Sequence, residues 1–226
     1  MVGLGHILFI GVAMYSYVPK NESRRFRIFC SDKLNQLKQD LKNKGYEVDF
    51  YLVDSGMKNL VTRNENESFD LDYNIEFLNV SISQLNPQEL KNYIISFLNK
   101  ITVENKPVFR NCQDSTSAIT SRLIVGGKLQ FSFDVAILAK NKDGDFCRLI
   151  HNKKANENSY HWDKIPKSKK VYKRFEKLKS AGHFNELRDT YLDKKNFYLI
   201  HNDHYHSSFT IFKETVNQTW SKYYRS

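Results

Sequence analysis

The sequence predicts an α+β fold, in which a mixed β-sheet with flanking helices is followed by a C-terminal helical lobe. The middle of the chain alternates apolar and polar residues, which is typical of strands with one buried face. The segments at 21–44 and after residue 166 repeat apolar residues every three or four positions, which is typical of amphipathic helices. The length of 226 residues and the hydrophobic content of 40% allow a sizeable core, in one domain or two small lobes.

We expect three segments along the chain. Residues 1–20 form an apolar N-terminal segment whose role the sequence does not reveal, residues 21–155 form the core with the sheet, and residues 156–226 form a basic helical lobe. The apolar run from Met1 to Val18 lacks the basic flank and the cleavage site of a secretory signal, and it is marginally short for a transmembrane helix. We therefore expect a buried or poorly ordered segment, and no membrane partner.

The first elements follow from the spacing of apolar residues. A helix is predicted at 21–44, where leucines recur at helical spacing and polar residues fill the other face. The elements after it are a strand at 47–53, a turn at Asp54-Ser55-Gly56, a short helix at 57–62 and a polar loop at 63–68. The next strand, at 69–80, has apolar residues on one face and Asp70, Asp72, Asn74 and Glu76 on the other.

The second half begins with a helix, because Asn86 is a good N-cap and Pro87 a good first residue; it runs to about residue 101. Three strands follow, at 117–125, 129–139 and 146–150, joined by short glycine-containing turns. Three helices form the predicted C-terminal lobe, at 169–180, 183–193 and 207–224.

Cysteine content and charge limit the class of protein. Three cysteines without CxxC spacing argue against a disulfide framework and a zinc site, and they fit reduced thiols in a cytoplasmic protein. The net charge is +10, and from residue 151 onward 16 Lys and Arg face 8 Asp and Glu. Two explanations stay open: a polyanionic substrate such as a nucleoside triphosphate or nucleic acid, or a solvated Lys-rich surface.

Asp70 and Asp72 give the strongest indication of a functional site. Residues two apart in a strand point to the same face, so the two carboxylates lie side by side and repel each other unless a cation lies between them. The polar face of an edge strand would also explain this pair. Asp134 favours a site, because it lies in the apolar sequence FSFDVAIL, where burying a lone carboxylate is costly. Three convergent carboxylates can hold Mg²⁺ together with the phosphates of a substrate.

These residues resemble the signature of the DNA polymerase beta-type nucleotidyltransferase superfamily. That signature has an apolar residue, Gly and then Gly or Ser, followed by a spacer and Asp-apolar-Asp/Glu-apolar. Here Ser55-Gly56 precedes thirteen residues and Asp70-Leu71-Asp72-Tyr73, and Asp134 matches the carboxylate that the family takes from a later strand. The surroundings of Asp134 are similar to the template-independent branch, which includes cyclic GMP-AMP synthase-like and bacterial dinucleotide-synthase-like enzymes. The resemblance covers about residues 47–140 and implies a nucleotidyltransferase fold with a catalytic core at 21–155.

The resemblance also implies an activity: Mg²⁺- or Mn²⁺-dependent transfer of a nucleoside monophosphate from an NTP to an acceptor hydroxyl, without a template. It implies Asp70, Asp72 and Asp134 as the ligands of two metal ions, one on the triphosphate and one that activates the acceptor, with Asp134 as a candidate general base. The acceptor stays open among a second nucleotide, an RNA 3′ end, a protein side chain and a small molecule.

Phosphate contacts are expected from the turn and from lysines. Ser55 and Gly56 would hold a phosphate, and Lys58, Arg63 and Lys173 are further candidates, with a plain surface charge as the alternative for each lysine and arginine. The order Ser-Gly departs from the family pattern, so either the pair is shifted by one residue or the phosphate grip is altered. This departure favours the alternative function, a non-catalytic nucleotide- or RNA-binding module on a degenerate transferase fold.

The C-terminal lobe offers weaker candidates. Lys169, Lys170, Lys173 and Arg174 share a predicted helix and could contact a triphosphate or an acceptor. The aromatic candidates for stacking on a base are Tyr160, Trp162 and Tyr172, and core packing is the alternative for each. The histidines at 201, 204 and 206 lack the spacing of a helical zinc pair, and we expect a loop without a metal.

Overall fold

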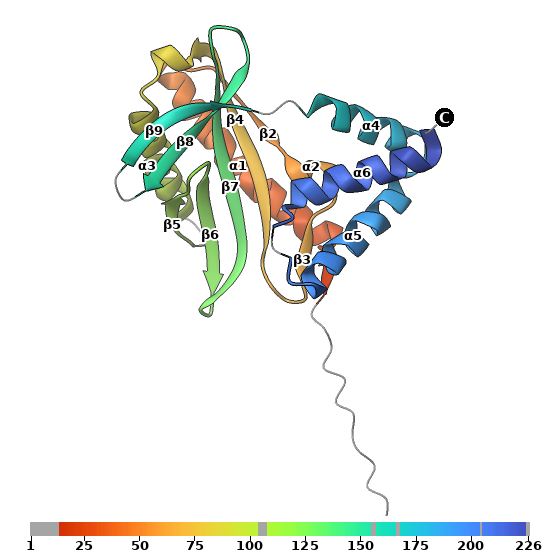
Figure 1. The fold of residues 1–226 in the computed structure, drawn as a ribbon. Helices are drawn as coiled ribbons and strands as arrows, with labels where there is room; N and C mark the ends of the chain where they lie inside the picture. Colours follow the sequence, from red (N-terminus) through yellow and green to blue (C-terminus); the bar gives the residue numbers. More distant parts are fainter. Residues whose placement is uncertain (1–13, 104–107, 155–156, 166–167, 204, 225–226) are drawn as a thin grey trace, which may run out of the picture.

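The computed structural model describes residues 14–103, 108–154, 157–165, 168–203 and 205–224. Figure 1 shows a twisted sheet with long helices packed on it and a group of three helices beside it. The predicted α+β fold is therefore confirmed. Of the apolar segment expected at 1–20, residues 1–13 lie outside the described residues.

The main sheet contains seven strands. The order is β2-β4-β7-β6-β5, and β8 and β9 extend the sheet from β7. Their bounds are Val48–Leu52 (β2), Phe69–Ser81 (β4), Phe109–Asp114 (β5), Ile119–Val125 (β6), Lys128–Lys140 (β7), Phe146–Lys154 (β8) and Glu157–Lys164 (β9). In the described part of the chain, β4 and β7 pair in parallel and the other neighbours pair antiparallel, so the sheet is mixed as predicted.

One face of the sheet is covered by α1 (Lys20–Asn43) and α3 (Pro87–Val103). The apolar residues of β4 alternate as the sequence predicted, and Leu71 and Ile75 are fully buried in the cluster that this face forms with the helices. Burying each such side chain contributes roughly 1.5–3 kcal/mol. Because alternation sends every second residue to the opposite face, the packing that stabilises β4 also fixes where its carboxylates point.

The C-terminal lobe consists of α4 (Lys169–Ser180), α5 (Phe184–Ile200) and α6 (Ser208–Tyr224). These three predicted helices are confirmed, and α5 runs further than expected. They enclose a second apolar cluster, which also contains Leu60 from the chain between β2 and β4. None of the described helices combines the length and the apolar character that crossing a membrane requires.

Several short elements differ from the expectation. The helix α2 (Asp54–Lys58) already begins at the predicted turn, and β3 (Thr62–Asn64) replaces part of the predicted loop by pairing with β1 (Tyr15–Tyr17). The strands β1, β5 and β9 and the 3₁₀ turn η1 (Ile82–Gln84) were not predicted. Since β9 pairs with β8, the segment 156–226 begins with a strand of the sheet and is helical only from α4 onward.

Candidate active site

The three predicted carboxylates meet on the face of the sheet opposite α1 and α3. The parallel pairing of β4 with β7 places Asp72 directly opposite Asp134, and Asp70 opposite Ser132 in the same register. Each of the three aspartates contributes an oxygen, and these oxygens all lie within 4.8 Å of one another. Asp70 is exposed, whereas Asp72 and Asp134 are half-buried. The arrangement joins two strands that are far apart in the sequence.

Burial and mutual repulsion destabilise the charged forms of these groups. Burial raises the pKa of Asp72 to about 7, and the nearby carboxylates of Asp70, Asp54 and Asp134 act in the same direction. The positive charge of Arg148 opposes this rise only in part. The pKa of Asp134 is also raised, first by burial, while the Thr120 hydroxyl acts against it.

The donor set fits a divalent cation. Oδ1 of Asp134 is buried and has no hydrogen-bond partner. Within the described residues, none of the three carboxylates forms an ion pair with a Lys or Arg side chain. Carboxylate oxygens are the ligands that Mg²⁺ prefers, and a cation among them would remove the repulsion that raises their pKa values. The residues present therefore match the expected metal site.

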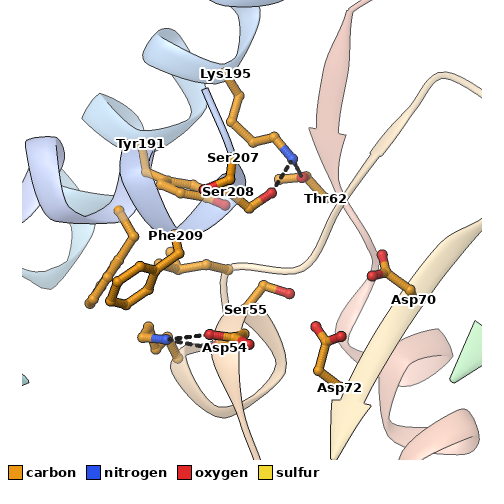
Figure 2. A pocket seen from close by; sticks show the side chains of 13 residues that line it. Asp54, Ser55, Thr62, Asp70, Asp72, Tyr191, Lys195, Ser207, Ser208 and Phe209 are labelled. Atoms are coloured by element: carbon orange, nitrogen blue, oxygen red, sulfur yellow. Dashed lines mark hydrogen bonds and ion pairs between the residues drawn. The ribbon is translucent and has the colours of Figure 1, made fainter. Parts of the chain in front are cut away.

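A cavity of about 240 Å³ adjoins the carboxylates, between the sheet and the C-terminal helices. Figure 2 shows Asp70 and Asp72 at one end and Lys195 with Ser207 and Ser208 at the other. Leu60, Tyr191, Phe209 and Phe212 add apolar side chains to the lining of the cavity. The cavity thus offers carboxylates at one end, hydroxyl groups and a cation at the other, and apolar side chains in its lining.

Lys195 was not predicted from the sequence. Its Nζ donates to Oγ1 of Thr62 at 3.0 Å and lies 3.5 Å from Oγ of Ser208. Burial lowers the pKa of Lys195, and the charge of Asp70 opposes this effect. In the sequence, Lys195 is marked only by its neighbour Lys194, and this pair does not predict that α5 lies beside β3.

Lys58 was predicted as a phosphate contact and does line the cavity. Only 3% of the residue is exposed, and its Nζ donates to the Asp54 carbonyl oxygen at 2.9 Å. Nζ also lies 4.4 Å from the centre of the Phe212 ring, which connects α2 to α6. Burial lowers the pKa of Lys58 to about 8, although Asp54 and Asp72 act in the opposite direction. The side chain is therefore a buried cation at the edge of the cavity.

The turn at 54–56 places Ser55 and Gly56, both expected to hold a phosphate, in different surroundings. Ser55 lines the cavity, whereas Gly56 is buried beneath it. A Cβ on Gly56 would lie 2.7 Å from Leu52 Cδ1, so this glycine allows α2 to pack on β2. The left-handed residue of the turn is Asp54, with φ of 50°, a conformation that favours glycine.

Other candidates lie away from the cavity. Lys173 is exposed on α4, in a separate groove, and Arg63 pairs with Glu22 of α1 at 2.8 Å. Tyr160 and Trp162 pack against the main core, and the aromatic rings in the cavity wall come from α5 and α6 instead. In the histidine loop, Nδ1 of His206 lies 2.9 Å from Oδ2 of Asp203, and His204 lies outside the described residues.

No protein-family model and no curated protein matches this chain. Solved structures do match. DncV of Vibrio cholerae in its GTP-bound form aligns with a TM-score of 0.54 at 16% identity, over 76% of this chain and 45% of DncV. CdnC of E. coli MS115-1 with ATP aligns with a TM-score of 0.55 at 16% identity, over 89% of this chain and 62% of CdnC.

A further DncV structure, described as a cyclic AMP-GMP synthase and a prokaryotic cGAS homolog, aligns with a TM-score of 0.51 at 15% identity. It covers 79% of this chain, and the chain spans about half the length of the DncV structures that it matches. At these identities the comparison concerns the fold. The chain therefore shares its fold, a mixed sheet with flanking helices, with the DncV and CdnC structures, and this agrees with the fold class that the sequence predicted.

Proposed function

We propose that this chain is a Mg²⁺- or Mn²⁺-dependent nucleotidyltransferase, which moves a nucleoside monophosphate from an NTP to an acceptor hydroxyl without a template. The observation that carries the proposal is the meeting of Asp70, Asp72 and Asp134 within 4.8 Å, with a buried oxygen of Asp134 lacking any hydrogen-bond partner. The fold agrees with it, because the matching DncV and CdnC structures contain GTP and ATP.

Asp70, Asp72 and Asp134 would hold the divalent cations. When bound there, such cations neutralise charge on the phosphates and lower the pKa of the acceptor hydroxyl. The acceptor oxygen then forms a bond to the α-phosphorus, the bond from that phosphorus to the β-phosphate oxygen breaks, and pyrophosphate leaves. Asp134 is the candidate group to take the proton of the acceptor hydroxyl.

The other end of the cavity would bind the triphosphate. Lys195 offers a charged donor, and Ser55, Thr62 and Ser208 offer hydroxyl groups around the same space. A hydrogen bond from a charged donor to a phosphate oxygen is stronger than a hydrogen bond between two neutral groups. The apolar part of the lining leaves room for a nucleoside against Phe209 and Tyr191.

The acceptor stays open among a nucleotide, an RNA 3′ end, a protein side chain and a small molecule. One matching DncV structure contains the linear intermediate 5′ pppA(3′,5′)pG, and that supports a second nucleotide. The second candidate function is a non-catalytic nucleotide- or RNA-binding module. The observation that favours it is Asp54, an acidic residue that lines the cavity in the turn expected to hold phosphate, with Oδ1 3.9 Å from Nζ of Lys58.

Incubation with each labelled NTP and Mg²⁺ separates the two functions. We expect pyrophosphate release and labelled product from the native chain. The Asp70→Asn/Asp72→Asn variant should fold and still bind nucleotide weakly, but turnover should fall to background. Nucleotide or RNA binding without turnover of any NTP by the native chain would instead support the binding module.

A further inference from the structure

A basic groove is lined by residues of α4 and by Trp220 of α6. The two helices are in contact and lie at one end of the molecule (Figure 1). The groove has a volume of about 500 Å³. Five cations and one aromatic residue line it: Lys169, Lys170, Lys173, Arg174, Lys177 and Trp220. We propose that this groove binds single-stranded nucleic acid, as a second anion site separate from the NTP cavity.

The positive charge of the groove is not balanced by neighbouring acids. In the described ranges, none of the four lysines or Arg174 forms an ion pair, and the single acid on α4, Glu176, lies 3.9 Å from Lys179 instead. Lys169 and Lys173, and likewise Lys173 and Lys177, are like charges four residues apart, which destabilise a helix. A bound polyanion would remove that repulsion, whereas solvation by water alone would leave the repulsion in place.

Trp220 holds two of the cations in the groove. The Arg174 guanidinium and the Lys177 Nζ each lie 5.3 Å from the centre of its ring. Tyr224 stacks on Trp220 at 4.4 Å, and Arg174 also donates to Oδ1 of Asn217 at 2.6 Å. Because these contacts position the charges before a ligand arrives, less conformational freedom is lost on binding.

The groove and the NTP cavity are separate sites on the same helix. Phe212 of α6 lines the cavity, and Trp220 lines the groove eight residues further on, about 12 Å along the helix axis. The groove residues and the cavity residues do not overlap. Binding in the groove therefore does not require the carboxylates or the proposed catalytic reaction.

The shape of the groove favours a nucleic-acid strand over a membrane. The cations run along two turns of α4, which suits a chain of phosphates. A helix that lies on a membrane needs an exposed apolar face, but the apolar side chains of α4, such as Phe175 and Leu178, are buried in the lobe. Positive grooves with aromatic walls are typical of sites for single strands.

The test measures binding of a fluorescent 20-nucleotide single-stranded RNA by anisotropy, without NTP, over a range of salt concentrations. The groove variant is Lys170→Glu/Lys173→Glu/Lys177→Glu. The control is Lys42→Glu/Lys100→Glu/Lys142→Glu, which changes the net charge equally at exposed lysines outside the groove. We expect at least tenfold weaker binding by the groove variant, a salt slope lower by about 2, and less than a twofold change for the control.

Equal weakening in both variants would overturn the proposal, because binding would then follow net charge alone. Binding to phosphatidylcholine–phosphatidylserine vesicles but not to RNA would overturn it as well. The Asp70→Asn/Asp72→Asn variant should bind RNA as the native chain does. Its transfer activity is measured separately, so failure of this proposal and failure of the proposed catalytic function give different results.

Discussion

At the scale of single residues, the acidic site is arranged for a ligand at the expense of stability. The pKa of Asp72 is raised to about 7, mainly by burial, so between roughly pH 4 and pH 7 the folded chain keeps a proton that the unfolded chain has released. The protonated Asp72 side chain therefore contributes its full share to the free energy of unfolding below about pH 4. This share is lost as the pH rises through 7, because the folded chain then carries the buried charge as well.

Replacing Asp72 should accordingly stabilise the metal-free protein. In chelator-containing buffer at pH 8, Asp72→Asn is expected to raise the free energy of unfolding by on the order of 2–4 kcal/mol, with a smaller gain near pH 4. Urea unfolding at both pH values measures this. Asp189→Asn, at an exposed aspartate, is the control and should change little. A destabilised Asp72→Asn protein at pH 8 would contradict the electrostatic explanation.

Lys195 gives a second prediction at this scale. Lys195→Ala should raise the KM for NTP by about 10–100-fold, because a hydrogen bond to a charged group contributes about 1.5–3 kcal/mol. Metal affinity, measured by titration with Mn²⁺, should stay the same. The matched control is Lys194→Ala, whose side chain lies 3.7 Å from Glu214 instead of in the cavity. Equal KM values for the two variants would remove Lys195 from the phosphate site.

At the scale of elements, the turn into α2 is the most unusual part of the site. Asp54 occupies a left-handed conformation that glycine adopts without strain, and this acidic residue lines the cavity. The strain and the negative charge are two separate effects of one side chain. Two variants of Asp54 and one of Asn59, at the other end of α2, can distinguish them.

Asp54→Gly and Asp54→Asn should both lower the KM for NTP, by about 2–10-fold, because each removes a negative charge near the phosphates. Only Asp54→Gly should also gain stability, of about 0.5–1 kcal/mol, from relief of strain. Asn59→Gly, at the other left-handed end of α2 (φ of 55°), should gain stability without a change in KM. An unchanged KM in both Asp54 variants would show that this carboxylate does not face the phosphates.

The elements also show what the sequence could predict. The alternation of apolar and polar residues predicted that Asp70 and Asp72 share one face of a strand. Asp134 was identified because a lone carboxylate in an apolar strand is costly to bury. The strands β5 and β9 escaped prediction because their exposed positions are polar, and strand pairing through the backbone needs no apolar pattern. Lys195 escaped because its partner Thr62 lies 133 residues away, a contact that only the packing of the helices creates.

At the scale of the whole molecule, the cavity depends on contacts between the sheet and the C-terminal helices. Leu60 is 1% exposed and joins the cluster of α4, α5 and α6. Arg188 donates to the Asn59 carbonyl oxygen at 2.8 Å, and Tyr17 donates to the Arg188 carbonyl oxygen at 2.7 Å. These contacts hold Lys195 opposite the carboxylates.

Leu60→Ala should therefore weaken both folding and nucleotide binding. A buried leucine truncated to alanine costs about 2–5 kcal/mol, and here the cavity wall loosens as well. Leu78→Ala, at an exposed leucine of β4, should cost much less. Urea unfolding and nucleotide titration measure the two effects. A Leu60→Ala protein that loses stability but binds nucleotide normally would show that the helices are not needed to shape the cavity.

The most direct test of the proposed catalytic site is a crystal structure with a nonhydrolysable NTP analogue and Mn²⁺, whose anomalous signal locates the metal. We expect Mn²⁺ bound by Asp70, Asp72 and Asp134, with the triphosphate extending toward Lys195 and Ser55. Nucleotide bound elsewhere, with no metal among the three carboxylates at saturating Mn²⁺, would contradict the account.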